Sequence, residues 1–441
     1  MKTRLLNLWE AVRTSFWFVP SLMVFGTIVL ATVGLQVDRR WQPAATDVFG
    51  LLYSGGPEAA RSILATVASS MITVAGVVFS ITMVVLALAT SQFGPRLLRN
   101  FRTDRGNQIV LGAFIATFIY CLIVLQAATQ FFVPRLSVAV SLALALLDVC
   151  ILIYFIHHIS VSIQADHVTT MVYRELMANI QRLFPDELKE PPVEAASPES
   201  FLCDSADRPQ QPIPAPHDGY VQVIELDRLR DIATKHDFVL LLHCCPGQFV
   251  VSGENLATAR GAGKLDDELA QEIARAVIIG SQRTPAQDIE FSIHQLVEVA
   301  IRALSPSVND PYTAIACIDR LAAALCRLSG KAFPSSCTRD STGKPRVFRP
   351  ASDFSGVLNA AFDQIRQYGR SSVAVTIHLL EALGEIAALA QTHGQARAIL
   401  RQAQMILRAS RDALPEVNDR HDVERRYDAV VELLRKRFSI R

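Results

Sequence analysis

Four long apolar stretches constrain the fold of this chain more than any other feature of its sequence. They lie at residues 16–37, 62–91, 109–132 and 136–159 and contain almost no charged residues. An α-helix needs roughly 20 predominantly apolar residues to cross about 30 Å of hydrocarbon. We therefore predict a four-helix transmembrane domain over residues 1–160. The first stretch exceeds the roughly 7–15 apolar residues of a signal peptide, which indicates a retained helix.

Arginine residues near these stretches predict the orientation in the membrane, because cytoplasmic loops carry an excess of Lys and Arg. The loop after the second stretch holds four arginines close together: Arg96, Arg99, Arg102 and Arg105. The connections on the opposite side hold four that are more widely spread: Arg39, Arg40, Arg61 and Arg135. We therefore expect the N- and C-termini to lie in the cytoplasm.

Beyond residue 160 the composition becomes that of a water-soluble protein. Residues 161–217 predict a helical extension followed by a proline-rich linker, and residues 218–262 predict a β-rich module. Helical patterns occupy residues 263–329 and 354–441, and the polar stretch 330–353 predicts a loop. The expected fold is a mainly α membrane protein, in which four transmembrane helices precede an α+β cytoplasmic domain.

Charge and cysteine content argue against nucleic-acid binding and a metal site. The formal net charge is only +1, whereas nucleic-acid binding normally requires a basic face. The eight cysteines are dispersed and never form a C-x-x-C pair, which indicates free thiols. The neighbouring His157 and His158 point to different faces of a helix and cannot hold one metal ion together. We expect no metal.

The second stretch carries a stripe of small and hydroxylated residues at helical spacing. Its nine positions are Ser62, Thr66, Ser69, Thr73, Gly76, Ser80, Met83, Ala87 and Thr90, and all except Met83 are small or hydroxylated. Small and hydroxylated residues let membrane helices approach closely, so the stripe fits a packing seam inside one subunit. If several copies met around an axis, the same stripe could instead line a water-filled pore.

Asp148 lies in the middle of the fourth stretch. A carboxylate at the bilayer centre costs at least about 2.5–3.5 kcal/mol, so its side chain should face protein or water. It fits a proton or cation relay, a hydrogen-bond partner for the hydroxyl stripe, or a protonated structural residue.

The soluble part contains one dense polar segment, residues 281–314. Asp288 and Asp310 fit helix N-caps, the second followed by Pro311 at the first helical position. Caps do not explain the crowding of the other polar side chains: Arg283, Gln287, His294, Gln295, Arg302, Ser305, Ser307 and Asn309. Two neighbouring helix N-termini could form an anion site. The alternatives are a ligand or interface site, or a set of caps and polar turns.

Motifs for catalysis and cofactor binding are absent from the sequence. The run of residues 261–264 lacks the spacing and the hydroxyl of a P-loop. No G-x-S-x-G, H-E-x-x-H or G-x-G-x-x-G motif is present. We therefore expect no cofactor and no enzymatic activity.

Several strings resemble a family of bacterial predicted membrane proteins, domain of unknown function 2254. They are VFSITMVVLALATSQFGPRLLRNF (78–101), LGAFIATFIYCLIVL (111–125), YFIHHIS (154–160) and RTPAQDIEFSIHQLVEVAIRALSPSVNDPYTA (283–314). The resemblance implies an inner-membrane protein with four helices and a cytoplasmic domain, and it implies no activity. The polar residues of 283–314 match the pattern of the family.

Two hypotheses of function remain. The first is a homo-oligomeric channel or channel-like conductance, which conducts a small anion or other ion and is regulated by the cytoplasmic domain. The second is a membrane-bound sensor or scaffold whose cytoplasmic domain binds a ligand or a protein. Four helices without an inverted repeat argue against a monomeric transporter. The lipid bilayer is the expected partner in either case.

Overall fold

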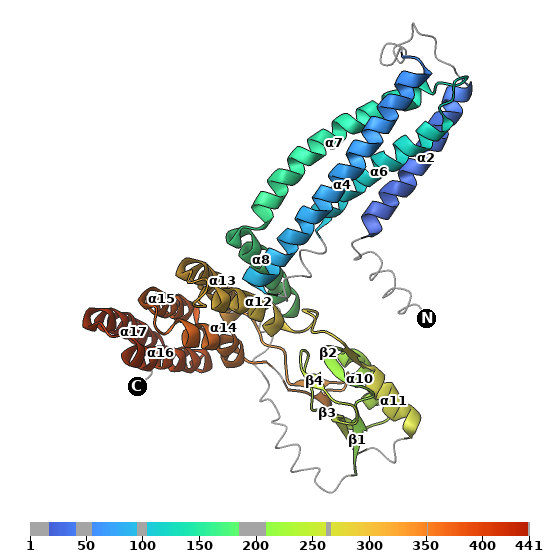
Figure 1. Ribbon diagram of the computed structural model, residues 1–441. Helices are drawn as coiled ribbons and strands as arrows, with labels where there is room; N and C mark the ends of the chain where they lie inside the picture. The colour runs from blue at the N-terminus through green and yellow to red at the C-terminus, as the bar shows by residue number, and fades with distance from the viewer. Residues whose placement is uncertain are drawn as a thin grey trace. The chain divides into compact units, whose positions relative to one another are not determined.

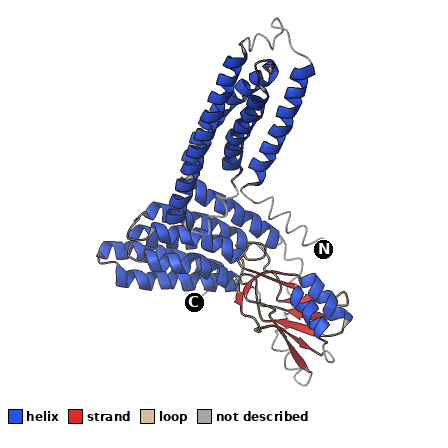
Figure 2. Ribbon diagram, turned by 45° about the vertical axis from the view of Figure 1, so that its right-hand side comes forward, coloured by secondary structure: helices blue, strands red, loops and turns tan. Residues whose placement is uncertain are grey.

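The computed structural model describes residues 17–40, 55–94, 104–184, 209–261, 266–350 and 352–439. The chain divides after His167 into two compact units. The first unit holds four long helices, and the second holds shorter helices and two β-sheets (Figures 1 and 2). The predicted fold, four long apolar helices followed by a mixed α and β part, is confirmed.

The four long helices are α2 (Phe18–Arg40), α4 (Pro57–Phe93), α6 (Arg105–Ala127) and α7 (Arg135–Ser162). All four are long and apolar enough to cross a membrane. The third ends at Ala127 rather than at residue 132, because Thr129 and Phe132 exchange backbone hydrogen bonds of 3.0 and 3.3 Å in the connection to α7. The two helices are therefore joined by a longer turn than the sequence predicted.

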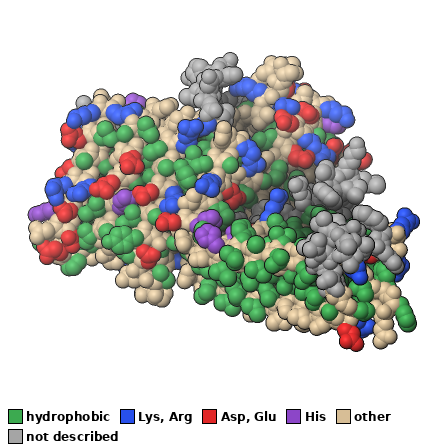
Figure 3. All heavy atoms as spheres, turned by 90° about the horizontal axis from the view of Figure 1, so that it is seen from above, with side chains coloured by type: hydrophobic (Ala, Val, Ile, Leu, Met, Phe, Trp, Pro, Cys, Tyr) green, Lys and Arg blue, Asp and Glu red, His purple; other side chains and the backbone are tan. Residues whose placement is uncertain are grey.

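Helix α6 is the central helix of the first unit. It packs against α2, α4 and α7, and it is the most buried of the four. Phe114, Tyr120 and Cys121 of α6 are core residues. The other three helices expose many large apolar side chains, and Figure 3 shows hydrophobic side chains crowded over one area of the surface. Such an area is too large for a water-exposed surface and fits contact with lipid.

A carboxylate from α2 caps the first turn of α7. Asp38 accepts hydrogen bonds from the backbone N–H groups of Leu136 (2.9 Å) and Ser137 (3.0 Å), and from the Ser137 hydroxyl (2.6 Å). Pro134, at the N-cap position, provides no such bond. Asp38 therefore supplies acceptors that the first turn of a helix lacks, at its positive end.

Among the residues that the structure describes, seven long helices follow the membrane helices, and five of them begin at side-chain caps. They are α8 (Ala165–Leu183), α12 (Ile289–Ala303), α13 (Pro311–Ser329), α14 (Phe354–Gly369), α15 (Val373–Leu389), α16 (His393–Ala413) and α17 (Val417–Phe438). The side chains of Asp288, Asp310, Asp353, Thr392 and Glu416 accept backbone hydrogen bonds at the starts of α12, α13, α14, α16 and α17. These caps fix where the helices begin.

Two sheets form the β part of the second unit. Their strands are β1 (Gln210–Pro214), β2 (Gly219–Ile224), β3 (Val239–Leu242), β4 (Phe249–Val250), β5 (Asn255–Arg260), β6 (Val277–Gly280), β7 (Cys337–Arg339) and β8 (Pro345–Phe348). The strand orders are β1-β5-β3-β8-β7 and β4-β2-β6. All pairs are antiparallel except β3 with β8. Helices α10 (Leu226–Lys235) and α11 (Asp267–Arg275) share one core with the strands.

Some secondary structure differs from the sequence expectation. Strands β7 and β8 lie in the segment 330–353 that was predicted as a loop, and β8 pairs with a strand about one hundred residues earlier. Strand β1 lies at the end of the predicted proline-rich linker. It pairs only with β5, and an edge strand tolerates proline. Residues 185–208 of that linker and the arginine-rich loop 95–103 lie outside the described residues.

Candidate functional site

The small and hydroxylated stripe of α4 lies on the outward face of this helix. Eight of its nine members are exposed: Ser62, Thr66, Ser69, Thr73, Gly76, Ser80, Met83 and Ala87; Thr90 is half-buried. The opposite face packs on the bundle through Leu64, Ala68 and Val78, among others. Among the described residues, the stripe therefore does not pack against the other helices of its own bundle.

The two halves of the stripe have different surroundings. Between residues 58 and 70, every exposed residue of α4 is small or polar: Glu58, Ala59, Arg61, Ser62, Ala65, Thr66, Ser69 and Ser70. From Ile72 onward, the exposed residues include large apolar side chains such as Phe79 and Val84. The second half thus has the composition of a lipid-facing surface, and the first half does not.

Three hydroxyl groups between Ser62 and Thr73 bond to their own helix. Thr66 donates to the carbonyl of Ser62 (2.7 Å), Ser69 to that of Thr66 (3.0 Å), and Thr73 to that of Ser69 (2.7 Å). Each hydroxyl proton is therefore used, while the oxygen lone pairs remain available as acceptors. The face presents hydrogen-bond acceptors outward without an unsatisfied donor at these three positions.

Asp148 does not belong to this stripe. Its side chain is only 2% exposed and lies on the buried face of α7. It interacts with Thr117 and Cys121 of α6, both of which are also buried. The carboxyl group therefore faces protein, as predicted, but the hydroxyls of α4 are not its hydrogen-bond partners.

A histidine and an aspartate join α6 to the far end of α7. The Nε2 atom of His158 lies 2.7 Å from Oδ2 of Asp104. Asp104 is also the N-cap of α6 and accepts a 2.9 Å bond from the N–H of Gly106. Tyr154 stacks on the His158 ring, with centroids 5.4 Å apart. His158 is thus a contact between α6 and α7.

In the second unit, Arg283 and Asp288 form a tight ion pair at the start of α12. Two guanidinium nitrogens lie 2.6 and 2.9 Å from Oδ2 of Asp288, and Oδ1 accepts from the N–H of Phe291 (3.1 Å). Gly247, with φ +89°, lies directly against the pair, where a side chain would collide with both partners. The turn before β4 and the start of α12 are therefore locked together.

Ionisable groups around this pair are shifted mainly by burial. Burial raises the pKa of Asp288, and the neighbouring Arg283 opposes the rise. Burial, followed by repulsion from Asp288, raises the pKa of Glu290. Burial also raises the pKa of the Cys245 thiol, which reduces its reactive thiolate at neutral pH. The cluster fits a structural contact better than a nucleophilic site.

The remaining predicted residues do not meet at one site. Gln287 pairs with the backbone of Ile224 in β2, accepting at 2.9 Å and donating at 3.2 Å. Asn309, with φ +50°, shapes the turn before α13. Ser305, Asn309 and Asp310 thus lie at one end of α12 and Asp288 at the other, about 22 Å apart. The half-buried His294 lies between them.

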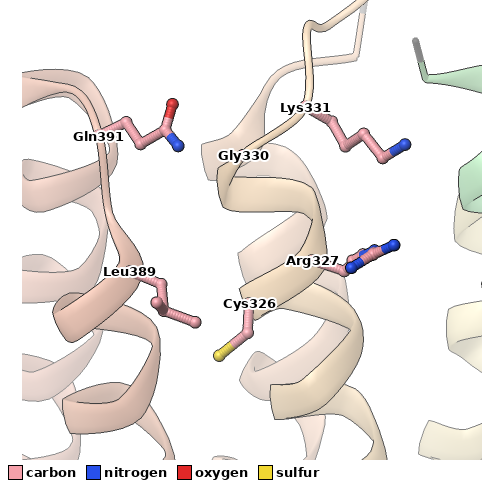
Figure 4. A pocket seen from close by; sticks show the side chains of 6 residues that line it. All are labelled: Cys326, Arg327, Gly330, Lys331, Leu389 and Gln391. Atoms are coloured by element: carbon pink, nitrogen blue, oxygen red, sulfur yellow. The ribbon is translucent and has the colours of Figure 1, made fainter. Parts of the chain in front are cut away.

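A cavity of about 280 Å³ lies at the ends of α13 and α15, where the sequence predicted nothing. It is lined by Cys326, Arg327, Gly330, Lys331, Leu389 and Gln391. Figure 4 shows the Cys326 sulfur turned toward Leu389, whereas Arg327 and Lys331 point away to the other side. Burial raises the pKa of the Cys326 thiol. The cations and the thiol do not converge on one ligand position.

Sequence reasoning missed the two aspartates that hold the membrane helices together. Asp38 lies 98 residues before its partner Leu136. Asp104 is followed by a helix and had the signature of an N-cap, so its capping role could have been found. Its contact with His158 could not, because the two residues lie 54 positions apart.

Comparisons with known proteins agree with the membrane architecture. The family model described as predicted membrane protein (DUF2254) matches residues 13–385. The uncharacterized proteins Rv1290c of Mycobacterium tuberculosis and Mb1321c of Mycobacterium bovis are each 33% identical over 434 residues, covering 95% of this chain and 81% of theirs. No solved structure matches. Because the family model covers most of the chain, the protein belongs to the DUF2254 family of membrane proteins.

Proposed function

We propose that this chain forms a homo-oligomer in the bacterial inner membrane and that the oligomer has a channel-like conductance. The outward face of α4 from Ser62 to Thr73, defined here as Ser62, Ala65, Thr66, Ser69, Ser70 and Thr73, would line a shared aqueous path. Both termini and the second unit would lie in the cytoplasm, where the second unit would regulate opening. The proposal treats the chain as a membrane assembly rather than an enzyme.

The composition of that face supports the proposal. All six residues are exposed within the chain, and none is large and apolar. Lipid tails gain little from contact with such a face, whereas small residues allow another helix to approach closely. Hydroxyl groups that donate to carbonyls of their own helix, as those of Thr66 and Thr73 do, also tolerate water and ions, because their lone pairs can accept hydrogen bonds or contact cations.

The length of the face adds a requirement. From Ser62 to Thr73 it covers about 17 Å, roughly half of the hydrocarbon thickness. The rest of a path would have to follow the second half of the stripe, from Gly76 to Thr90. Exposed apolar residues such as Phe79 border that half, so it would form the narrower and drier part.

The experiment compares leucine variants of Thr66 and Thr73 with Thr32→Leu. Thr32 is a matched control, because it is an exposed threonine of α2 whose hydroxyl also bonds its own helix (2.9 Å to the carbonyl of Val29). Light scattering of the protein in detergent measures the number of subunits, and planar bilayer recording measures current. We expect Thr66→Leu and Thr73→Leu to reduce the current and Thr32→Leu to leave it unchanged.

Three outcomes distinguish the hypotheses. A monomeric protein without current contradicts the proposal. A stable oligomer without current in any variant removes the conductance and favours the membrane-bound sensor or scaffold. Equal currents in the wild type and in all three variants show that the path does not run along this face of α4.

A further inference from the structure

Asp148 is a buried acid whose environment does not satisfy a negative charge. Its side chain is 2% exposed, and Oδ2 has no hydrogen-bond partner among the described residues. The buried neighbours on α6 are Thr117 and Cys121. An ionised carboxylate in such a site would keep an oxygen without a hydrogen bond in the middle of a membrane helix bundle, which is strongly unfavourable. A neutral carboxylic acid avoids most of that cost.

Asp38 in the same bundle is a buried carboxyl group whose oxygens both have hydrogen-bond partners. It is also 2% exposed, but its two oxygens accept three hydrogen bonds from Leu136 and Ser137. It lies at the N-terminus of α7, where the helix dipole favours negative charge. Two equally buried aspartates thus differ in their surroundings: both oxygens of Asp38 accept hydrogen bonds, whereas Oδ2 of Asp148 has no partner among the described residues.

The surroundings of Asp148 fit a proton better than a metal cation. Hard divalent cations take about six or more oxygen ligands, and the described residues hold no group of three side chains suited to a metal. Cys121 is the titratable group that faces Asp148 from α6. Residues 18–37 of α2 and 62–93 of α4 contain no ionisable side chain. A counter-charge is therefore missing on these helices, and a proton supplies the neutralising charge.

The two directions along the bundle differ in polarity. Toward the Asp38 end, the buried face of α7 carries Ser141 and Ser137, and the hydroxyl of Tyr120 donates to the carbonyl of Ser137 (3.2 Å). Toward the opposite end, Phe114 and Phe155 are fully buried in an apolar cluster. The polar groups at this second end, among them Ser162 and the His158–Asp104 pair, lie beyond that apolar cluster. The less obstructed polar side of Asp148 is therefore the one toward Asp38.

We propose that Asp148 is a proton-binding site inside the bundle of each subunit, loaded at neutral pH, and that it exchanges its proton with the end of the bundle that holds Asp38. Release breaks the O–H bond of the acid and leaves a carboxylate; the proton passes to water, and uptake is the reverse. Ser141 lies two helical turns from Asp148, about 10 Å along α7, so water must complete the route. The site is independent of the face of α4 proposed to line a channel.

Infrared spectroscopy of the full-length protein tests the site directly. The protein is labelled with 4-¹³C-aspartate and studied in a detergent without ester groups. At pH 7 we expect the carbonyl band of a protonated labelled aspartic acid. The band should be lost in Asp148→Asn and should move to the unlabelled frequency of glutamic acid in Asp148→Glu. If Asp148→Asn does not fold, Asp148→Glu alone makes the assignment.

The route has its own matched pair of variants. Ser141 and Ser162 are both buried on α7, and each hydroxyl bonds a carbonyl three residues earlier, at 2.7 and 3.0 Å. They lie on opposite sides of Asp148, and Phe155 separates Ser162 from it along the helix. In D₂O, Ser141→Ala should slow the isotope shift of the band severalfold, and Ser162→Ala should not.

A wild-type spectrum without the band at pH 7 overturns the proposal, because Asp148 would then be ionised. A band that survives in Asp148→Asn assigns the proton to another aspartate and has the same consequence. Equal exchange rates in both serine variants overturn the route to the Asp38 end. Because conductance plays no part in these measurements, their failure is distinct from a failure of the proposed channel.

Discussion

Replacing Asp288 with alanine should destabilise α12 by more than the loss of an ordinary helix cap. One carboxylate oxygen caps α12, and the other holds Arg283 at 2.6 and 2.9 Å. A lost cap costs about 1 kcal/mol. Breaking a fully buried ion pair costs roughly 3–5 kcal/mol. The Arg283 side chain is 23% exposed and can turn toward water, so we expect roughly 1–2 kcal/mol for the pair and roughly 2–3 kcal/mol in total.

Asp353 is the control for the cap alone. It caps α14 through a 2.7 Å bond from the N–H of Gly356, at an exposed position. Asp353→Ala should therefore cost α14 only about 1 kcal/mol. Asp288→Asn keeps a capping oxygen but removes the charge, because asparagine is also a good N-cap. Its effect on α12 should fall between those of the wild type and Asp288→Ala.

Hydrogen–deuterium exchange of the full-length protein in detergent, read by mass spectrometry, measures both helices in one sample. A factor of ten in exchange corresponds to about 1.4 kcal/mol. Amides of α12 should therefore exchange roughly 30- to 100-fold faster in Asp288→Ala, and those of α14 roughly fivefold faster in Asp353→Ala. If α12 accelerates no more than α14, the ion pair adds nothing to the cap and the reasoning is refuted.

Three further predictions concern single contacts. In Gly106→Ala the new methyl group would lie 2.7 Å from Nε2 of His158, so the His158 side chain must leave Asp104. The thermal unfolding temperature should therefore fall. Gly26→Ala is the control and should not lower it, because its methyl group meets nothing within 4 Å. Gly247→Ala should destabilise the second unit by more than about 1 kcal/mol, measured by the same exchange experiment, because its φ of +89° is unfavourable for alanine and its side chain would collide with the ion pair. Hydrogen bonds from the Thr313 hydroxyl and two backbone N–H groups lower the pKa of Asp310. The stabilisation by this cap is therefore complete above the unfolded pKa of about 3.9 and is lost as the pH falls below that value. In that range, the difference in unfolding temperature between the wild type and Asp310→Ala should shrink.

Local patterns in the sequence predicted the features that depend on a few neighbouring residues. Twenty apolar residues in succession specify a membrane-spanning helix regardless of the rest of the chain. An aspartate before a helical pattern specifies a cap, and Asp288 and Asp310 are both confirmed as caps. In each case the partner lies within a few positions, so the pattern itself contains the contact.

Contacts between distant segments could not be predicted in the same way. Asp38 caps a helix that begins nearly one hundred residues later, and no local pattern connects the two. Strand β8 has only four residues, too few for a clear alternation, and its pairing with β3 depends on the burial of Val347. The polar segment 281–314 appeared as one site because its residues are close in sequence, yet α12 separates them by its full length.

The pattern of small residues on α4 could not show which face is outward, because small residues occur on both faces of its first half. Ala60 and Ala68 lie against the bundle, while Thr66 and Ser69 lie on the opposite side. A helix that touches lipid on one side needs small residues only on the packed side, since large apolar side chains fill the contact with lipid. Small residues on both sides instead allow close neighbours on both sides. The bundle is one of these neighbours, and a second copy of this chain, as proposed above, would be the other.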